Sequence, residues 1–223
     1  MVLDDSYFDL VGSPTPSPAI QWLEISKRFE FNGPAVILVL DISSSSQMID
    51  EFTRSGMINV YQDELIGDLK RDIANIVWPR RILAHPYKFT GDGWIFILPV
   101  SNTDGAKLLP LMREICVAYR RSASQIQKRL SSPPSVMGVK FGADVGEIRQ
   151  MTIYQDREWV GLPINVACRL QGHVDKTTTN VALVTDRVFN QFLAPATGFE
   201  VEHRICELRK IQGKQACAQI RLL

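Results

Sequence analysis

The stretch YKFTGDGWIFIL, residues 87–98, decides how the rest of the chain is interpreted. Gly91 and Gly93 supply the backbone freedom of a tight turn, and apolar side chains alternate after it with the period of a strand. These features predict a β-hairpin with Asp92 at its tip. A carboxylate between two glycines is most often ordinary turn chemistry, so Asp92 alone indicates no function.

A second stretch of sequence favours a metal-binding role for Asp92. Residues 35–40, AVILVL, form an apolar run typical of a buried strand, and Asp41 follows the run directly. If this strand is a neighbour of the hairpin, Asp41 and Asp92 converge. Carboxylates are preferred ligands of hard divalent cations, and two such ions commonly serve phosphoryl transfer. The two stretches together therefore predict a two-metal site.

Four serines, Ser43, Ser44, Ser45 and Ser46, separate Asp41 from a predicted helix over residues 47–54. Serine hydroxyls favour helix N-termini, where free backbone N–H groups bind anions. Because the serines follow a candidate metal ligand, we expect them to contact phosphate. A polar loop without a ligand is the alternative.

The remaining pattern predicts a mixed fold. Apolar residues at helical spacing indicate helices over residues 59–77, 106–130, 164–171 and 186–193. Strands are expected over residues 136–143, 180–184, 199–208 and 216–222, with a second hairpin over 149–159. The order β-α-α-β-β-α-β, followed by an αβαβ segment, favours an α+β sandwich with antiparallel strands over a doubly wound fold.

Residues 1–34 are expected to be a lead-in to a single domain over residues 35–223. The segment GSPTPSP is typical of an extended linker, and a short helix is expected over residues 20–31. The acidic start MVLDDSYFDL is unlike a signal peptide, so we expect a cytoplasmic location.

Composition excludes several classes of protein. The chain of 223 residues has 25 Lys and Arg against 24 Asp and Glu, which gives no basic field for nucleic acid or an anionic membrane. No apolar run approaches the length of a membrane span. Four scattered cysteines, without a CxxC pair, indicate reduced thiols and neither a disulfide framework nor a zinc site.

Five segments, in this order, resemble the catalytic domain of the class III nucleotide cyclases, the fold of adenylate and guanylate cyclases. They are VILVLDIS, KFTGDGWIF, VKFGADVGEI, WVGLPINVACRLQ and ELRKIQGKQACAQIRLL. The resemblance covers nearly everything after Pro34 and implies a ferredoxin-like βαββαβ palm core with a C-terminal αβαβ extension. The short chain, KFTGDGW and INVACRLQ are more narrowly similar to the stand-alone Pycsar cyclases of bacterial anti-phage defence, which make cyclic pyrimidine nucleotides.

The resemblance assigns the catalytic residues. Asp41 and Asp92 match the metal aspartates, and the backbone carbonyl of Ile42 would add a ligand to two Mn²⁺ or Mg²⁺ ions per site. Asn165 would orient the ribose, and Arg169 would stabilise charge on the α-phosphate. Since Asn165 and Arg169 are four apart, they share one helix face.

Two further cations match phosphate contacts of the family. Lys214, after Gly213, corresponds to a lysine that reaches the terminal phosphates, and Arg149 is a second candidate. For both, a solvated surface charge is an equally good interpretation.

Lys88 and Glu158 fall where the family contacts the base, although Asp156 is an alternative to Glu158. The pair offers one donor and one acceptor, which uracil, cytosine and adenine all satisfy. The longer acid narrows the pocket and so favours a smaller ring. With the Pycsar resemblance, this leads us to expect UTP as the substrate and cyclic UMP as the product, with cytidylate or adenylate cyclase as alternatives.

The resemblance also implies a head-to-tail homodimer with two shared active sites, each built from both subunits. Two other classes remain. Diguanylate cyclases and polymerase palms share the two-acid layout, but the GGDEF signature is absent. A degenerate domain that only binds nucleotide is the non-enzyme alternative, and it usually lacks a metal acid or the arginine matched by Arg169.

Overall fold

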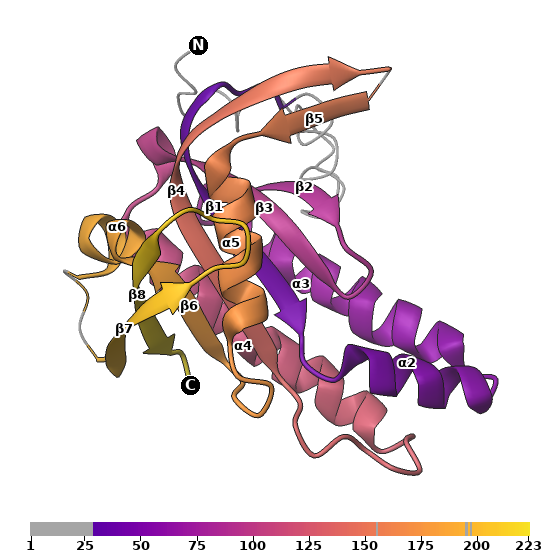
Figure 1. The fold of residues 1–223 in the computed structure, drawn as a ribbon. Helices are drawn as coiled ribbons and strands as arrows, with labels where there is room; N and C mark the ends of the chain where they lie inside the picture. Colours follow the sequence, from indigo (N-terminus) through magenta and orange to yellow (C-terminus); the bar gives the residue numbers. More distant parts are fainter. Residues whose placement is uncertain (1–28, 155, 195, 197) are drawn as a thin grey trace.

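The computed structural model describes residues 29–154, 156–194, 196 and 198–223 (Figure 1). The predicted linker and most of the predicted helix over residues 20–31 lie outside the described residues. The strands are β1 (Gly33–Ile42), β2 (His85–Phe89), β3 (Gly93–Pro99), β4 (Val139–Ile153), β5 (Asp156–Val160), β6 (Val181–Thr185), β7 (Val201–Glu207) and β8 (Lys214–Arg221). The principal helices are α2 (Ser45–Arg54), α3 (Asp68–Val77), α4 (Gly105–Gln127) and α5 (Leu162–His173).

Shorter or irregular helical segments complete the chain. They are the π-helix η2 (Val60–Gly67) directly before α3, the single turn η3 (Val100–Asn102), α6 (Asp186–Val188) and the π-helix η4 (Phe189–Leu193). No described helix combines the length and the apolar character that crossing a membrane requires.

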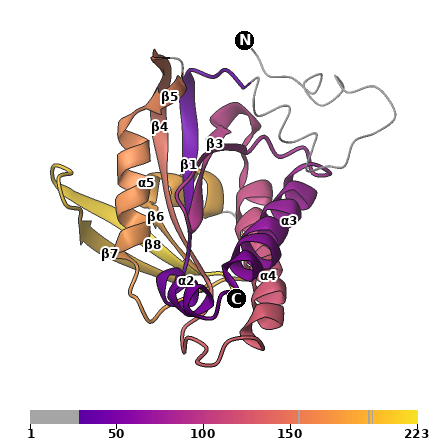
Figure 2. The ribbon, with the colours of Figure 1, turned by 90° about the vertical axis from the view of Figure 1, so that its right-hand side faces the viewer.

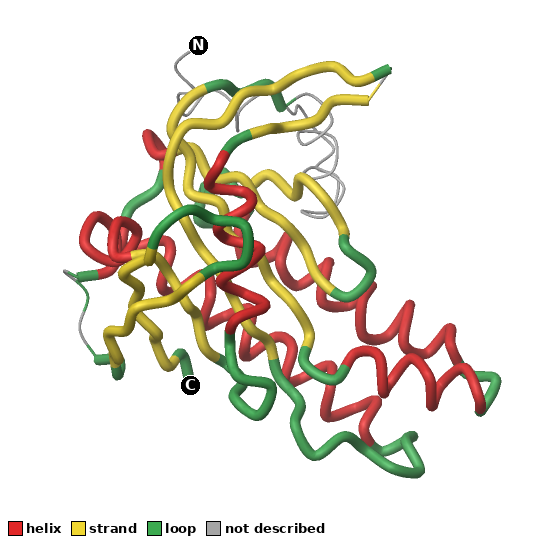
Figure 3. The backbone as a smooth tube through the Cα atoms, viewed as in Figure 1, coloured by secondary structure: helices red, strands yellow, loops and turns green. Residues whose placement is uncertain are grey.

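The strands form one sheet in the order β2-β3-β1-β4-β6-β8-β7, and β5 pairs only with β4 (Figure 3). Every pairing is antiparallel except the parallel pair β4–β6. The predicted α+β fold is confirmed. The strands expected over residues 199–208 and 216–222 form the closing hairpin β7–β8, so the order after β5 is αβαββ when both strands are counted.

Strand β1 divides the core into two layers. Its alternate residues from Val36 to Ile42 join a cluster with α3 and α4, whereas Ala35, Ile37 and Val39 pack on the opposite face with Ala167 of α5. The view in Figure 2 shows α5 on one side of the sheet and α3 and α4 on the other. Because side chains alternate along a strand, Asp41 belongs to the α5 face.

Helix α5 lies unusually close to the sheet at Gly142 of β4. A Cβ atom at this position would lie 2.1 Å from the carbonyl oxygen of Ala167 and 2.4 Å from the amide nitrogen of Gln171. Only glycine permits this approach. The contact fixes the C-terminal half of α5 above the end of β1, which is where Asp41 lies.

Strand β4 is longer than the sequence pattern predicted. The expected strand over residues 136–143 and the first arm of the hairpin over residues 149–159 form one continuous strand, which Gly142 and Gly146 cross without a break. Tyr154, expected on a strand, is instead a turn residue with φ 58° and a side chain that is 96% exposed. Gly142 and Gly146 interrupt the apolar pattern of β4 because α5 packs directly on the backbone of the strand at these two positions.

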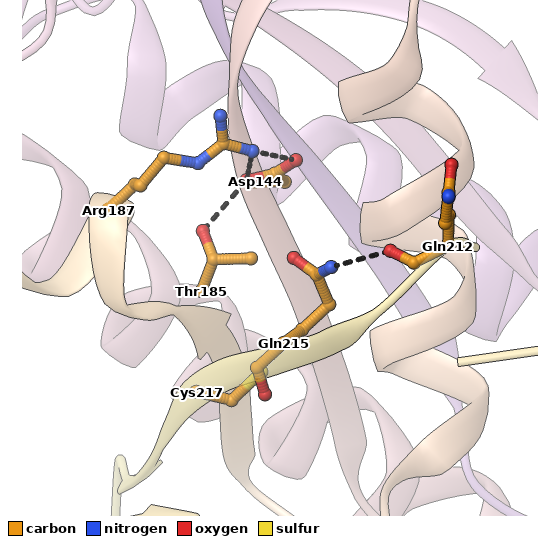
Figure 4. A network of polar contacts seen from close by, with 6 residues as sticks. All are labelled: Asp144, Thr185, Arg187, Gln212, Gln215 and Cys217. Carbon is orange, nitrogen blue, oxygen red and sulfur yellow. Dashed lines mark hydrogen bonds and ion pairs between the residues drawn. The ribbon is translucent and has the colours of Figure 1, made fainter. Parts of the chain in front are cut away.

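Asp144, the acid within the VKFGADVGEI segment, is structural. Its carboxylate is fully buried and accepts hydrogen bonds from the Thr185 hydroxyl at 2.7 Å and from the Arg187 guanidinium at 3.1 Å to each oxygen (Figure 4). A buried charge needs such a partner, and this network ties β4 to β6 and α6. The hydrogen-bond partners of Asp144 are thus Thr185 and Arg187, and Asp144 is not paired with Asp41.

An aromatic cluster closes the far end of the α5 face. Phe29 is buried and stacks on His85 with ring centroids 4.3 Å apart, and Trp159 of β5 lies 5.1 Å from the same imidazole. Packing thus begins before β1, at Phe29. Burial lowers the pKa of His85 to about 4, so the imidazole is neutral in the folded protein.

His85 is expected to make the free energy of unfolding depend on pH. Its pKa falls from 6.5 to about 4 on folding, so stability is complete above pH 6.5 and is lost as pH falls through 4. The loss corresponds to about 3 kcal/mol. His85→Phe keeps a ring against Phe29 and should remove this part of the pH dependence.

Chemical denaturation of the wild type and His85→Phe between pH 4 and pH 8 measures the difference. His173→Phe, at an exposed position of α5, is the matched control for replacing a histidine by phenylalanine. Parallel curves for the wild type and His85→Phe would contradict the assignment.

Candidate active site

Two carboxylates meet where β1 ends and where the β2–β3 turn passes into β3. Asp41 pairs in register with Gly93, where a Cβ atom would lie 2.0 Å from the carbonyl oxygen of Leu40. Glycine therefore lets the turn approach β1, and the Ile42 amide donates to the Asp92 carbonyl at 3.1 Å. The structure brings Asp41 and Asp92 into side-chain contact.

The environment of this acid pair is polar and partly buried. Burial raises the pKa of Asp41 to about 6, and the negative charge of Asp92 adds to the shift. Gln171 of α5 donates to Asp41 Oδ2 at 2.9 Å, and Ser45 of α2 donates to Asp92 Oδ2 at 2.5 Å. The pair is thus oriented by one residue from each side of the sheet's end.

Three residues near the acids were missed by sequence reasoning, namely Gln171, Lys140 and Tyr61. Lys140 of β4 pairs in register with Asp41 and is only 7% exposed. Burial lowers the pKa of Lys140, an effect that Asp41 opposes. Tyr61 in η2 is buried, and burial together with the charges of Asp92 and Asp41 raises its pKa. Lys140 lies in the quoted VKFGADVGEI segment, but only the strand register reveals its position.

The serines after β1 are used mainly within the protein. The Ser43 amide donates to the Gly138 carbonyl at 2.9 Å, and the Ser44 hydroxyl donates to the Val136 carbonyl at 2.8 Å. Ser45 binds Asp92, and Ser46 is exposed at the first turn of α2. Hydroxyl contacts to phosphate are thus not preformed at Ser44 and Ser45, and phosphate contact by this helix start stays a prediction.

The donor set at the acid pair fits hard divalent cations. Both facing groups are carboxylates, and burial together with the charge of Asp92 raises the pKa of Asp41, so a bound cation would favour its ionised form. Among the described residues, no group of three or more His, Cys, Asp or Glu forms a candidate metal site. Two carboxylates suffice for Mg²⁺ or Mn²⁺ when substrate phosphates and backbone carbonyls supply other ligands.

A second polar group forms between β2 and β5. The Lys88 ammonium lies 3.5 Å from Glu158 Oε1, and the Tyr87 hydroxyl donates to Glu158 Oε2. The structure places Glu158, and not Asp156, beside Lys88, because Asp156 pairs with Ile153 at the turn of the hairpin.

The remaining candidates lie apart from the acids. Asn165 and Arg169 are both exposed on α5. Lys214 begins β8 and lies 3.2 Å from Glu207. In the described part of the chain, no hydrogen bond or ion pair joins any of these three to Asp41 or Asp92.

Strand register separates the two phosphate candidates from the acids. Lys140 of β4 pairs with Val181 of β6, and Val181 pairs with Arg221 of β8. Lys214 lies at the opposite end of β8 from Arg221 and is therefore far from Lys140. Arg149 is exposed and lies nine residues beyond Lys140 on β4. One chain therefore does not bring Lys214 or Arg149 to its own acid pair.

Solved structures of nucleotide cyclases share this architecture. The guanylyl cyclase Cya2 superposes with a TM-score of 0.64 at 14% sequence identity, covering 86% of this chain and 93% of that one. For the adenylyl cyclase CyaB from P. aeruginosa the TM-score is 0.64 at 11% identity, with 85% and 94% covered. The chain has the class III cyclase fold. An adenylate/guanylate cyclase/hydrolase from Silicibacter pomeroyi gives a TM-score of 0.56 at 18% identity, with 85% and 97% covered.

No family model matches the sequence, and no curated protein does. Within the class III cyclase fold of this chain, the sequence-predicted residues divide into two sets. The acid set consists of Asp41, Ile42, Asp92 and the serines at the start of α2. The second set comprises the pair of Lys88 with Glu158, the exposed face of α5, and the cations Arg149 and Lys214.

Proposed function

We propose that the protein is a nucleotide cyclase that converts a nucleoside triphosphate into a 3′,5′-cyclic mononucleotide and pyrophosphate. The observation that carries the proposal is the facing pair Asp41 and Asp92 at the β1 end of a class III cyclase fold. A carboxylate pair in this place suits metal-assisted phosphoryl transfer and leaves no role for a side-chain nucleophile.

The residues of the acid set would perform distinct tasks. Asp41, Asp92 and the Ile42 carbonyl would hold two Mg²⁺ or Mn²⁺ ions, which when bound lower the pKa of the ribose 3′-hydroxyl and neutralise the triphosphate. Gln171 and Ser45 orient the carboxylates, and Lys140 adds a buried cation beside them. The ribose 3′-hydroxyl gives its proton to solvent water and its oxygen bonds to the α-phosphorus, the bond from that phosphorus to the bridging oxygen of the β-phosphate breaks, and pyrophosphate leaves.

The separation of the two residue sets supports a homodimer with shared sites. Asn165 and Arg169 face solvent on α5, and a second subunit would complete the site at Asp41 and Asp92. The β4–β5 hairpin projects from the sheet (Figure 1) and exposes apolar side chains, namely Met151, Ile153 and Val160. Such a patch is typical of an interaction surface.

For the substrate we infer UTP first, CTP second and ATP third. The Lys88 ammonium can donate to uracil O4 while Glu158 accepts from N3–H, and the two side chains lie side by side, 3.5 Å apart. The pyrimidine preference also rests on the resemblance to the Pycsar cyclases. A role in anti-phage defence, with cyclic UMP as the signal, has that resemblance as its only support.

The test is a competition among nucleotides. The protein is incubated with equal concentrations of ATP, CTP, GTP and UTP and Mn²⁺, and cyclic products are identified by mass spectrometry beside released pyrophosphate. We expect cyclic UMP to dominate. Cyclic AMP as the main product would refute the pyrimidine preference but not the cyclase activity. The absence of every cyclic product would refute the cyclase activity itself.

A further inference from the structure

A β-bulge in β2 directs two consecutive side chains to one carboxylate. Pro86 pairs with Phe96 and Lys88 pairs with Ile95, so Tyr87 between them has no partner on β3. Successive strand residues normally point to opposite faces, whereas a bulge redirects a side chain, commonly beside active sites. Here both Tyr87 and Lys88 contact Glu158.

The two contacts occupy different oxygens of Glu158. The Tyr87 hydroxyl donates to Oε2, and the Lys88 ammonium lies 3.5 Å from Oε1. The hydrogen bond from Tyr87 and the charge of Lys88 lower the pKa of Glu158, so the group is an ionised acceptor.

The surrounding rings keep this arrangement in place. The Tyr87 ring meets Trp159 edge-on with centroids 5.3 Å apart, and the Trp159 indole N–H donates to the Phe31 carbonyl at 3.0 Å. Strand β5 therefore docks on β2 through side chains, without backbone pairing. Removing the Tyr87 hydroxyl alone should leave the docking intact, because a phenylalanine ring preserves the aromatic contact.

We propose that Tyr87 is a specificity-determining positioning residue, which occupies one oxygen of Glu158 and so disfavours guanine in the base site. This inference rests on the proposed cyclase function and on the base contact by Lys88 and Glu158. With the Tyr87 hydroxyl on Oε2, Glu158 offers a base chiefly Oε1, which lies beside the Lys88 ammonium donor.

The Watson–Crick edges of the bases differ in what they need from that carboxylate. Uracil, cytosine and adenine each present one hydrogen-bonding donor group beside an acceptor. Guanine presents two adjacent donors, N1–H and the 2-amino group, which pair best with both oxygens of a carboxylate. With the Tyr87 hydroxyl already donating to Oε2, the second guanine donor must compete for that oxygen, and a weakly satisfied polar group in a binding site is costly.

The discriminating experiment compares Tyr87→Phe with Tyr154→Phe. Tyr154 lies in the turn of the β4–β5 hairpin with a fully solvated side chain, and is the matched control. Removing the Tyr87 hydroxyl should raise kcat/KM for GTP relative to UTP by about tenfold, the worth of one hydrogen bond to a charged group. The gain should appear in KM and not in kcat, because the contact is to the unreacting base. Tyr154→Phe should leave the ratio unchanged.

A direct binding measurement separates this inference from the proposed function. Titration calorimetry of GTP and UTP in Ca²⁺ on the wild type and Tyr87→Phe reports the same ratio without turnover. An unchanged ratio of dissociation constants, a wild type that already prefers GTP, or an equal shift in Tyr154→Phe would overturn the role of Tyr87. A shifted binding ratio without any cyclic product would retain Tyr87 as a base-selecting residue and refute the cyclase.

Discussion

Asp41→Asn and Asp92→Asn are each expected to reduce cyclic nucleotide formation at least about a hundredfold, since even outer-shell partners of metal ligands contribute ten- to a hundredfold. Each substitution removes one of only two carboxylates at the proposed metal site. Asparagine retains the shape and one acceptor oxygen. The hydrogen bonds from Gln171 to Asp41 and from Ser45 to Asp92 can therefore persist.

The same substitutions should not unfold the protein. The two carboxylates repel one another and burial disfavours the charge on Asp41, and relief of these two effects offsets the lost attraction between Asp41 and Lys140. Melting curves of each variant accompany the assay. Asp50→Asn on α2, whose carboxylate is exposed and paired with Arg54, is the matched control and should retain full activity. Retention of most activity by both active-site variants would contradict the two-metal proposal.

The sequence predicted the acid pair because both acids carry local signals. Asp41 ends an apolar strand and Asp92 occupies a glycine turn, and each feature is visible within about ten residues. Their meeting needed only that the strand and the hairpin be neighbours, which the β1–β3 pairing confirms. The order of helices and strands followed from periodicity in the same way.

Contacts that depend on register between distant strands were not predictable. Lys140 reaches Asp41 only because β4 pairs with β1 at that residue. The joint contact of Tyr87 and Lys88 with Glu158 depends on a bulge in β2. The length of β4 was hidden by Gly142, whose missing side chain makes room for α5. In each case the deciding partner lies far away in the sequence.

Asp92→Asn and Arg169→Ala should restore activity to one another when mixed, if the sites are shared between subunits. Asp92 belongs to the acid set, whereas Arg169 is exposed on α5 and has no contact with Asp92 among the described residues. Each variant alone is expected to be nearly inactive, because both sites of its homodimer carry the defect. In the mixed dimer, one site carries both defects and the other carries none.

Counting gives the size of the recovery. Equal mixing of freely exchanging subunits places half of the dimers in the mixed state, and one of the two sites in each is intact, so activity should reach about one quarter of the wild type per site. Co-expression with two affinity tags isolates the mixed dimer when exchange is slow, and its expected activity is about half of the wild type. A purified mixed dimer without activity would show that Asp92 and Arg169 serve one site from the same chain, since only then does every site of the mixed dimer carry a defect.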